Sequence, residues 1–394
     1  MRYCGAVRIK NREVNDMKKS LAIILALSML IALCAGCGDS NKPTGESQPV
    51  AQEGEPSEDP NSGAGGAEIA LICSAGGGSI NDRGFFQSTY EGIQEFCEET
   101  GHTYTYYDTA ENTIDSLYES IDLAVLNGAK VICTSGGDFV GMMEELYAAY
   151  PDLYFICNET PYTTPGENAV IYTFQAQDSA FLAGVAAVVE GYTDIGFVGG
   201  IPVLPVMRAG YGFIQGVNWA AGELGVEGIQ LKYWYSNSFE PSADIQAYAA
   251  AWFESGTELI AAFCGGAAPS VWAAAEASDG LCFGCDVDQY YESDTIITSV
   301  LKNVDVSTKE ALWGWENGEF PGGETISYGM ADGGVDLAMA HSLMESFTEE
   351  EYEHYRDLYI NELSENVYSV EDFESADDMW EALGEHNIEL QIYE

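Results

Sequence analysis

Positively charged residues are scarce in this sequence. Lys and Arg number 14 against 64 Asp and Glu, and six of the 14 lie within the first 19 residues. The rest of the chain is therefore strongly acidic, and such a surface repels nucleic acids and anionic lipid headgroups. This argues against a nucleic-acid-binding function. A lysine or arginine kept in this background becomes a candidate for a specific role.

Signatures of catalysis and of phosphate binding are also missing. The chain has only four histidines, and it contains neither a Gly-x-Ser-x-Gly elbow nor a His-Glu-x-x-His helix. None of its glycine clusters has the spacing of a P-loop. The sequence therefore predicts a binding protein and not an enzyme, with no catalytic residues, no metal site and no cofactor.

Cysteine is present but does not form a recognisable framework. The seven cysteines that follow Cys37 are Cys73, Cys97, Cys133, Cys157, Cys264, Cys282 and Cys285. Five of them lie in predicted strands beside aliphatic or aromatic residues, where a thiol packs as a small apolar group. The Cys282-Phe-Gly-Cys285 pair has no second pair or histidine at ligand spacing, which favours core packing. A disulfide between these two remains open.

The N-terminal region has the pattern of an export signal. Met17-Lys18-Lys19 precedes an apolar stretch over residues 21–33, and Ala35-Gly36-Cys37 follows it. A basic start, a short apolar run and a small-residue site are typical of a secretory signal. We predict a signal peptide over residues 1–36, with Met17 as the start. The residues before Cys37 resemble a bacterial lipobox, which implies lipidation of Cys37; ordinary cleavage and free secretion is the alternative.

Residues 37–67 form a predicted linker. They are rich in Pro, Gly, Ser and acidic residues and have no periodic apolar face, as in flexible tethers. A lipid anchor followed by a tether would hold the folded part against the extracytoplasmic face of the cell membrane.

From residue 68 onward, apolar strands alternate with amphipathic helices. Strands are predicted over residues 68–75, 102–108, 130–135, 153–158, 169–174, 194–198, 229–235, 258–264 and 281–285, and helices over 84–100, 112–128, 138–150, 178–191, 206–224, 241–255 and 269–277. Repeated strand–helix–strand units with short loops indicate an α/β protein whose sheets are parallel. The length suits two such sheets.

Glycine clusters follow four of these strands. They are Gly76-Gly77-Gly78, Gly136-Gly137, Gly199-Gly200 and Gly265-Gly266. Each can serve as a tight turn alone, but ligands of open α/β sheets bind beyond the carboxyl ends of the strands, where glycine permits close approach. Four clusters over two successive units predict two such edges facing one ligand cleft.

Six short motifs follow the order of the motifs of a known family. The first is Asn81-Asp82-Arg83-Gly84-Phe85-Phe86-Gln87, which is similar to the family's Asn-Asp-Lys-Ser/Gly-Phe-Asn-Gln. The other five lie at residues 181–187, 195–200, 238–241, 284–289 and 298–302. Together they resemble the basic membrane protein family of substrate-binding lipoproteins of ABC importers, whose characterised members bind purine nucleosides.

This resemblance implies a two-lobed type I periplasmic-binding-protein fold with three hinge crossovers. Each lobe would be a parallel sheet flanked by helices. We expect residues 68–175 and 299–323 in the first lobe, and residues 176–298 and 324–394 in the second. The ligand would lie in the cleft between the lobes, with its base stacked on aromatic rings and its ribose held by an Asp and a Lys.

The candidate ligand-binding residues are Asn81, Asp82, Phe85, Gln87, Asp138, Phe239, Gly265, Asp286 and Lys302. A carboxylate and an ammonium suit the hydroxyl groups of a nucleoside, and Asp286 with Lys302 would supply them. Phe85 and Phe239 are the stacking candidates. Several of these residues have a purely structural alternative. Asn81, Asp82 and Asp138 can cap helices. Phe85 and Phe239 can pack in the core, and Lys302 can lie on the surface.

The expected partners are a small molecule, with a purine nucleoside first, and the permease subunits of an importer; no nucleic acid is expected, and the chain is expected to be a monomer. Two alternatives remain. A sensor that presents a sugar or a flavin to a receptor would use the same fold. A nucleoside hydrolase is less favoured: Asp286 and Asp288 could bind a cation, but the next acidic cluster is distant in the sequence.

Overall fold

The computed structural model describes residues 66–75 and 79–393. The predicted signal peptide, nearly all of the linker, and the lipidation site at Cys37 lie outside the described residues. Within those residues, no helix combines the length and apolarity needed to cross a membrane.

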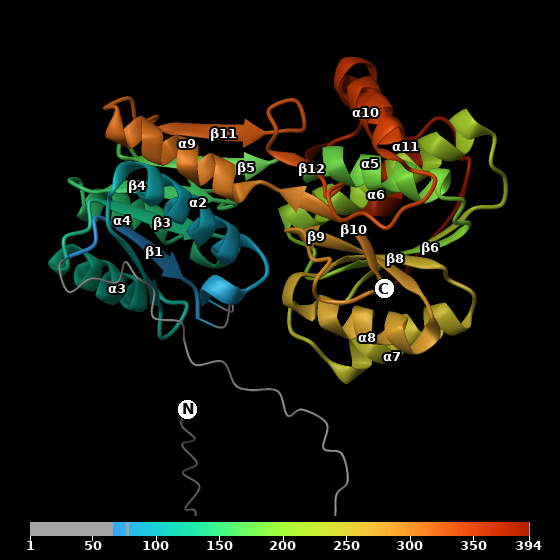
Figure 1. Ribbon diagram of the computed structural model, residues 1–394, viewed down its shortest axis with the longest axis horizontal. Coiled ribbons are helices and arrows are strands. Elements are labelled where there is room, and N and C mark those ends of the chain that lie inside the picture. The colour runs from blue at the N-terminus through green and yellow to red at the C-terminus, as the bar shows by residue number, and fades with distance from the viewer. Residues whose placement is uncertain (1–65, 76–78, 394) are drawn as a thin grey trace, which may run out of the picture. The chain divides into compact units, whose positions relative to one another are not determined.

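The first sheet contains six parallel strands in the order β11-β5-β4-β3-β1-β2. Its strands are β1 (Ile69–Cys73), β2 (Tyr104–Asp108), β3 (Val131–Ser135), β4 (Tyr154–Asn158), β5 (Ala169–Phe174) and β11 (Glu324–Tyr328). Every residue of the central strands β1 and β3 is buried, because helices cover both faces (Figure 1). Continuous apolar runs are what such doubly covered strands require.

The helices of the first sheet are α2 (Phe85–Thr100), α3 (Ile114–Leu126), α4 (Met143–Ala149) and α9 (Val304–Glu316). Helices α2 and α9 pack together on one face, where a side chain at Gly92 would overlap the backbone of Asp305. On the other face, Tyr118 of α3 donates a hydrogen bond to Glu145 of α4. The single helix predicted over residues 138–150 is wrong: Gly141 has a φ of +82° and separates η2 (Gly137–Phe139) from α4.

The second sheet contains seven strands in the order β12-β10-β9-β8-β6-β7-β13. They are β6 (Asp194–Gly199), β7 (Gln230–Tyr235), β8 (Leu259–Phe263), β9 (Leu281–Asp286), β10 (Ile296–Lys302), β12 (Val335–Leu337) and β13 (Glu389–Tyr393). All neighbours are parallel except β10 and β12.

Helices α5 (Ala176–Val189) and α6 (Leu204–Leu224) cover one face of the second sheet, and α7 (Ala243–Glu254) and α8 (Ala268–Ser278) cover the other (Figure 1). Helices α5 and α6 approach very closely. Side chains at Gly212 and Gly216 of α6 would overlap the backbone of Gln177 and Phe181 in α5. Glycine at these two positions therefore allows the helices to pack backbone against backbone.

The chain crosses between the sheets three times: from β5 to α5, from β10 to α9, and from β11 to β12. This confirms the predicted fold class, but two predicted boundaries are displaced. Residues 299–302 belong to β10 in the second sheet, and β11 joins the first sheet. A buried strand carries no local signal for the sheet that it joins, because strand pairing is set by distant residues.

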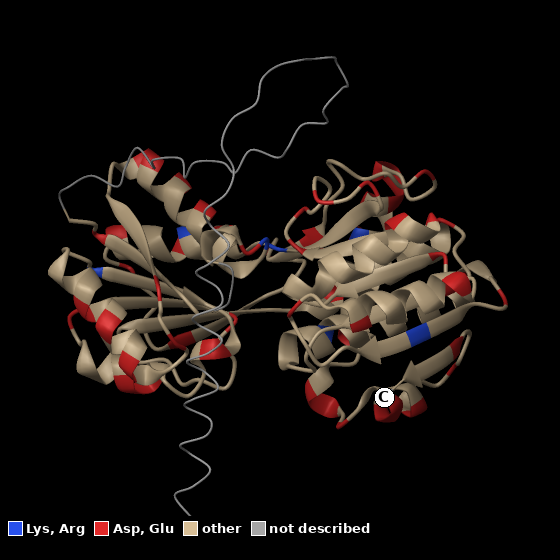
Figure 2. Cartoon of the chain, turned by 90° about the horizontal axis from the view of Figure 1, so that it is seen from below, with Lys and Arg blue, Asp and Glu red and all other residues tan. Residues whose placement is uncertain are grey.

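The C-terminal region contributes helices and one strand to the second sheet. Helix α10 (Glu349–Leu358) and the short α11 (Ala376–Ala382) are followed by β13, which adds an edge strand parallel to β7. Figure 2 shows Asp and Glu scattered over the helices and loops of both sheets, with few Lys or Arg among them.

Candidate functional site

Asp286 and Lys302 meet at the carboxyl ends of two neighbouring parallel strands, β9 and β10. Lys302 Nζ lies 3.1 Å from Asp286 Oδ1, and the lysine side chain is 9% exposed. Burial acts to lower the pKa of Lys302, but the carboxylates of Asp286 and Glu159 outweigh it and the pKa lies above its ordinary value. The site therefore contains a buried, charged ammonium in a chain with few cations.

The backbone of Asp286 is held in an unusual conformation. Its φ is +70°, in the left-handed region that non-glycine residues seldom adopt and that often marks a binding site. The turn after it is fixed by Gln289, whose side-chain oxygen accepts the backbone N–H of Cys285 at 2.9 Å. The Asp286 carboxylate is therefore presented at the strand end by a defined turn.

Phe85 belongs to the first sheet's helix α2 and yet lies beside Lys302. Lys302 Nζ is 4.7 Å from the centroid of the Phe85 ring, within the range of a cation–π contact. Three groups from separate elements are thus brought together: a carboxylate, an ammonium and an aromatic ring. The structure thus brings together three of the nine candidate residues, and their contact with a ligand stays a prediction.

Asp82 fixes the start of helix α2. Its carboxylate accepts the backbone N–H groups of Gly84, Phe86 and Gln87 at 2.9–3.0 Å. Burial raises the pKa of Asp82, and the charge of Asp286 adds to the rise. The structure thus gives Asp82 the helix-capping role that the sequence left open, while its charge is felt at Asp286.

The other candidates associated with the first sheet have partners other than Lys302, or none, among the described contacts. Gln87 donates to Glu91 one turn further along α2, and Asn81 is exposed at the end of η1 (Ser79–Asn81). Asp138 is exposed and accepts a hydrogen bond from Ser74 Oγ at 2.7 Å. Ligand contacts of these three residues stay predictions.

Phe239 and Gly265 are neighbours at the carboxyl ends of the second sheet's strands. The Phe239 ring packs over Gly200 and Gly265, and a side chain at Gly200 would overlap it. Two of the four glycine clusters therefore make room for an aromatic ring. Their role as a ligand wall remains a prediction.

Glu159 is the residue that sequence reasoning missed. It is 2% exposed and has a φ of +50°. One carboxylate oxygen accepts the backbone N–H of Phe174 at 2.6 Å. Burial raises the pKa of Glu159, although the charges of Lys302 and Arg208 act to lower it. Its one signal in the sequence is its place directly after the apolar strand β4, close to the strand end that Asp286 occupies in β9.

Arg208 of α6 also contacts the backbone of Phe174, the residue that Glu159 binds. It donates to the Phe174 carbonyl at 3.2 Å and to the carboxylate of Glu371 at 2.5 Å. Phe174 ends β5, at the first crossing between the sheets. Arg208 therefore ties the crossing at Phe174 to the exposed Glu371 of the C-terminal region, while the buried Glu159 holds Phe174 and acts on Lys302 and Arg208 through its charge.

Asp288, the second member of the acidic pair considered for a cation, turns to another partner. Its carboxylate lies 2.7 Å from His341 Nδ1. Among the described residues, no cluster of three potential metal ligands is present. The arrangement of Asp286 with Lys302 is suited to hydroxyl groups instead, because it offers a charged acceptor beside a charged donor.

All seven described cysteines are buried and unpaired. Burial raises the pKa of Cys282 to about 12 and that of Cys285 well above its ordinary value. Such thiols are unreactive and pack as apolar groups. The core-packing interpretation of Cys282 and Cys285 agrees with this arrangement.

The raised pKa of Glu159 predicts a pH-dependent stability. Folded protein keeps the Glu159 carboxyl proton at pH values where the unfolded chain has lost it. The protonated carboxyl group therefore contributes stability that is fully present below pH 4.5 and is lost as the pH rises through the raised pKa. Urea unfolding should show that the free energy of unfolding of the wild type falls, relative to that of Glu159→Gln, as the pH rises over this range. The exposed Glu167→Gln is the control, and a Glu159→Gln difference independent of pH would contradict the assignment.

Two mostly parallel sheets, joined by three crossings and carrying polar groups at their strand ends, form a periplasmic-binding-protein fold. An ABC transporter solute-binding protein from Aeropyrum pernix K1 aligns with a TM-score of 0.61 and 20% identity over 79% of this chain and 84% of its own. One from Conexibacter woesei gives 0.62 and 17% over 78% and 100%. At these identities the likeness shows the fold alone.

Sequence comparison supplies the family. Residues 69–369 match the family described as ABC transporter substrate-binding protein PnrA-like, and the chain belongs to it. It is 27% identical over 353 residues to the ABC transporter nucleoside-binding protein BmpA of Lactococcus lactis, covering 84% of this chain and 94% of that protein. It is 26% identical over 355 residues to basic membrane protein A of Borreliella burgdorferi, covering 88% and 94%. The predicted family is confirmed, and the protein is an ABC transporter substrate-binding protein.

Proposed function

We propose that the ligand of this protein is a purine nucleoside, held by Asp286, Lys302 and Phe85. The observation that carries the proposal is the 3.1 Å pair of Asp286 and Lys302 beside an aromatic ring. The name of the Lactococcus lactis relative, a nucleoside-binding protein, supports the same ligand class.

The chemistry of each group suits one part of such a ligand. Ribose hydroxyls donate to a carboxylate and accept from an ammonium, and both hydrogen bonds are strengthened by charge and burial. The purine is flat and apolar on its faces, so it can stack on the Phe85 ring, with Phe239 as the second candidate. Asp138 and Asn81 would reach the edge of the base.

Binding would draw the two sheets together about the three crossings. Phe85 comes from the first sheet and Asp286 and Lys302 from the second, so a ligand that contacts all three favours the conformation in which they are close. The closed monomer would then deliver its ligand to permease subunits. Lipidated Cys37 and the linker would keep it at the extracytoplasmic face of the membrane.

A thermal-unfolding panel tests the ligand class. Guanosine, inosine and adenosine should raise the melting temperature, because ligand at 100 times its Kd stabilises the fold by about 2.7 kcal/mol. Sugars, amino acids and flavins are the comparison set. A rise in melting temperature with a sugar, an amino acid or a flavin, and none with any nucleoside, would overturn the nucleoside assignment. Release of free base from inosine would show that the protein hydrolyses its ligand.

A further inference from the structure

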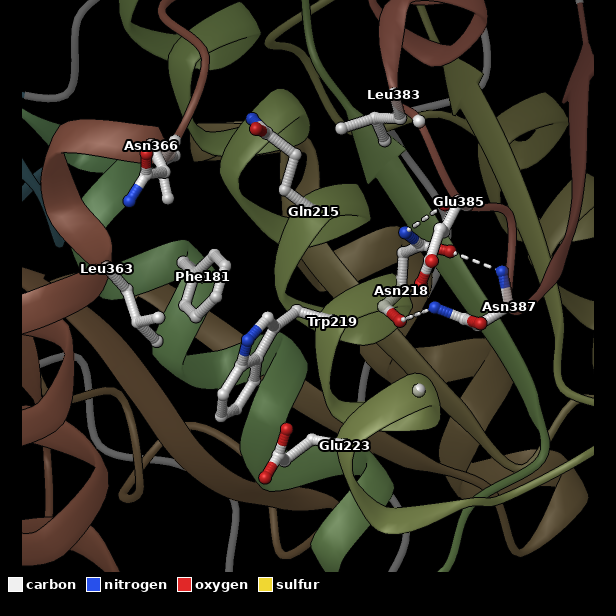
Figure 3. Close-up of a pocket in the computed structure, with 13 residues that line it drawn as sticks. Phe181, Gln215, Asn218, Trp219, Glu223, Leu363, Asn366, Leu383, Glu385 and Asn387 are labelled. Carbon is white, nitrogen blue, oxygen red and sulfur yellow. Dashed lines mark hydrogen bonds between the residues drawn. The ribbon is translucent and has the colours of Figure 1, made fainter.

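A cavity lies on the second sheet, between helices α5 and α6 and the C-terminal region. Its volume is about 450 Å³, and we call it the C-terminal pocket. Phe181 of α5, Trp219 and Glu223 of α6, and Leu383 and Glu385 of the C-terminal region are among the residues that line it (Figure 3). None of the nine predicted nucleoside-binding residues lines this pocket.

The pocket wall is held in place by reciprocal hydrogen bonds. Asn218 donates to the Glu385 carbonyl at 2.9 Å and accepts the Asn387 backbone N–H at 2.7 Å, while the Asn387 side chain donates to the Asn218 carbonyl at 3.1 Å (Figure 3). Gln215 makes a similar exchange with Tyr368. These amides are therefore occupied within the protein, and they fix the pocket's shape.

The groups left for a ligand are of two kinds. The first is an apolar and aromatic floor, in which the Phe181 and Trp219 rings have centroids 5.8 Å apart, with Leu363 and Leu383 beside it. The second is a pair of carboxylates, Glu223 and Glu385, and no ion pair involves either of them among the described residues. The pocket thus offers two exposed carboxylates beside the partly exposed indole ring of Trp219, with the buried Phe181 ring behind it.

Part of the pocket lies beyond the residues that the family model matches. Leu383, Glu385 and Asn387 follow residue 369, where the match to the family ends. The pocket is therefore built where the C-terminal region packs against α6. A role in it would be additional to ligand capture at Asp286 and Lys302.

We propose that the C-terminal pocket binds a small organic cation with an apolar body, such as an aryl-alkyl amine or a quaternary ammonium. An ammonium group is attracted to the face of an indole ring and to carboxylates, and its apolar part is covered by the leucine and phenylalanine side chains. The net charge of −50 adds a favourable long-range field for a cation and an unfavourable one for an anion.

Isothermal titration with matched probes tests this proposal on the folded protein. Phenethylamine and benzyltrimethylammonium should bind in the millimolar range or tighter, whereas phenylacetate, with a similar body and opposite charge, should not. The double variant Glu223→Gln/Glu385→Gln should bind the cations roughly fivefold more weakly. Glu227→Gln, an exposed acid next to the pocket-lining helix, should bind them like the wild type.

The outcomes separate this site from the nucleoside site. The double variant should keep the thermal shift with nucleosides, and Asp286→Asn should keep cation binding. Equal binding of phenylacetate and phenethylamine, no binding of either cation, or unchanged cation affinity in the double variant would each overturn the proposal. None of these results would bear on the nucleoside assignment.

Discussion

Replacing Lys302 by methionine is expected to abolish nucleoside binding and to destabilise the fold by about 3–5 kcal/mol. Methionine fills a similar volume but leaves two carboxylates without their cation. Glu159 is 2% exposed and the Asp286 side chain is 18% exposed, so neither can regain full hydration. Urea unfolding measures the stability, and the thermal shift with guanosine measures the binding.

Lys232→Met is the matched control for this loss. Lys232 is the other buried lysine of the second sheet, and its Nζ lies 2.7 Å from Asp194 Oδ1. Asp194 begins β6, whereas Lys302 ends β10, so the Lys232 ion pair lies near the amino ends of the strands and the Lys302 ion pair at their carboxyl ends. Both variants should be less stable, but only Lys302→Met should lose ligand binding. Retained guanosine binding in Lys302→Met would remove the ammonium from the site.

Asp286→Asn should weaken nucleoside binding by roughly 10- to 150-fold while the protein stays folded. A hydrogen bond to a charged group is worth about 1.5–3 kcal/mol, and asparagine keeps the shape but loses the charge. Asparagine also tolerates the positive φ of this position better than alanine, so the backbone turn should survive. Calorimetric titration of guanosine into the two proteins gives the ratio of affinities.

Asp279→Asn provides the comparison for Asp286→Asn. Asp279 has a φ of +52° and precedes β9, whereas Asp286, at +70°, ends the same strand. The substitution and the backbone conformation are therefore alike, and only the end of the strand differs. Asp279→Asn should bind guanosine as the wild type does; equal losses in both variants would point to a general effect of the substitution.

The order of strands and helices could be predicted because each buried strand is a continuous apolar run. The failures have local and non-local causes. Gly141 divides a predicted helix through its backbone conformation. Strand β13 lies at the C-terminal end of the described chain, and its pairing with β7 depends on residues far away in the sequence. The sheet that β10 joins is likewise set by β9 and β12 and not by its own sequence.

The candidate site was predictable where a polar residue follows an apolar strand and a family motif includes it. Asp286 and Lys302 meet both conditions. Glu159 follows β4 with neither a glycine cluster nor a motif, so its burial beside Lys302 and Arg208 emerged only from the fold. Asp82 matched a motif, yet its described contacts are those of a helix cap.

A crystal structure of the protein with its stabilising nucleoside tests the central claim most directly. We expect the ribose hydroxyls within hydrogen-bonding distance of the Asp286 carboxylate and the Lys302 ammonium, with the purine stacked on Phe85. A nucleoside bound away from these three side chains, for example in the C-terminal pocket beside Trp219, would contradict the account.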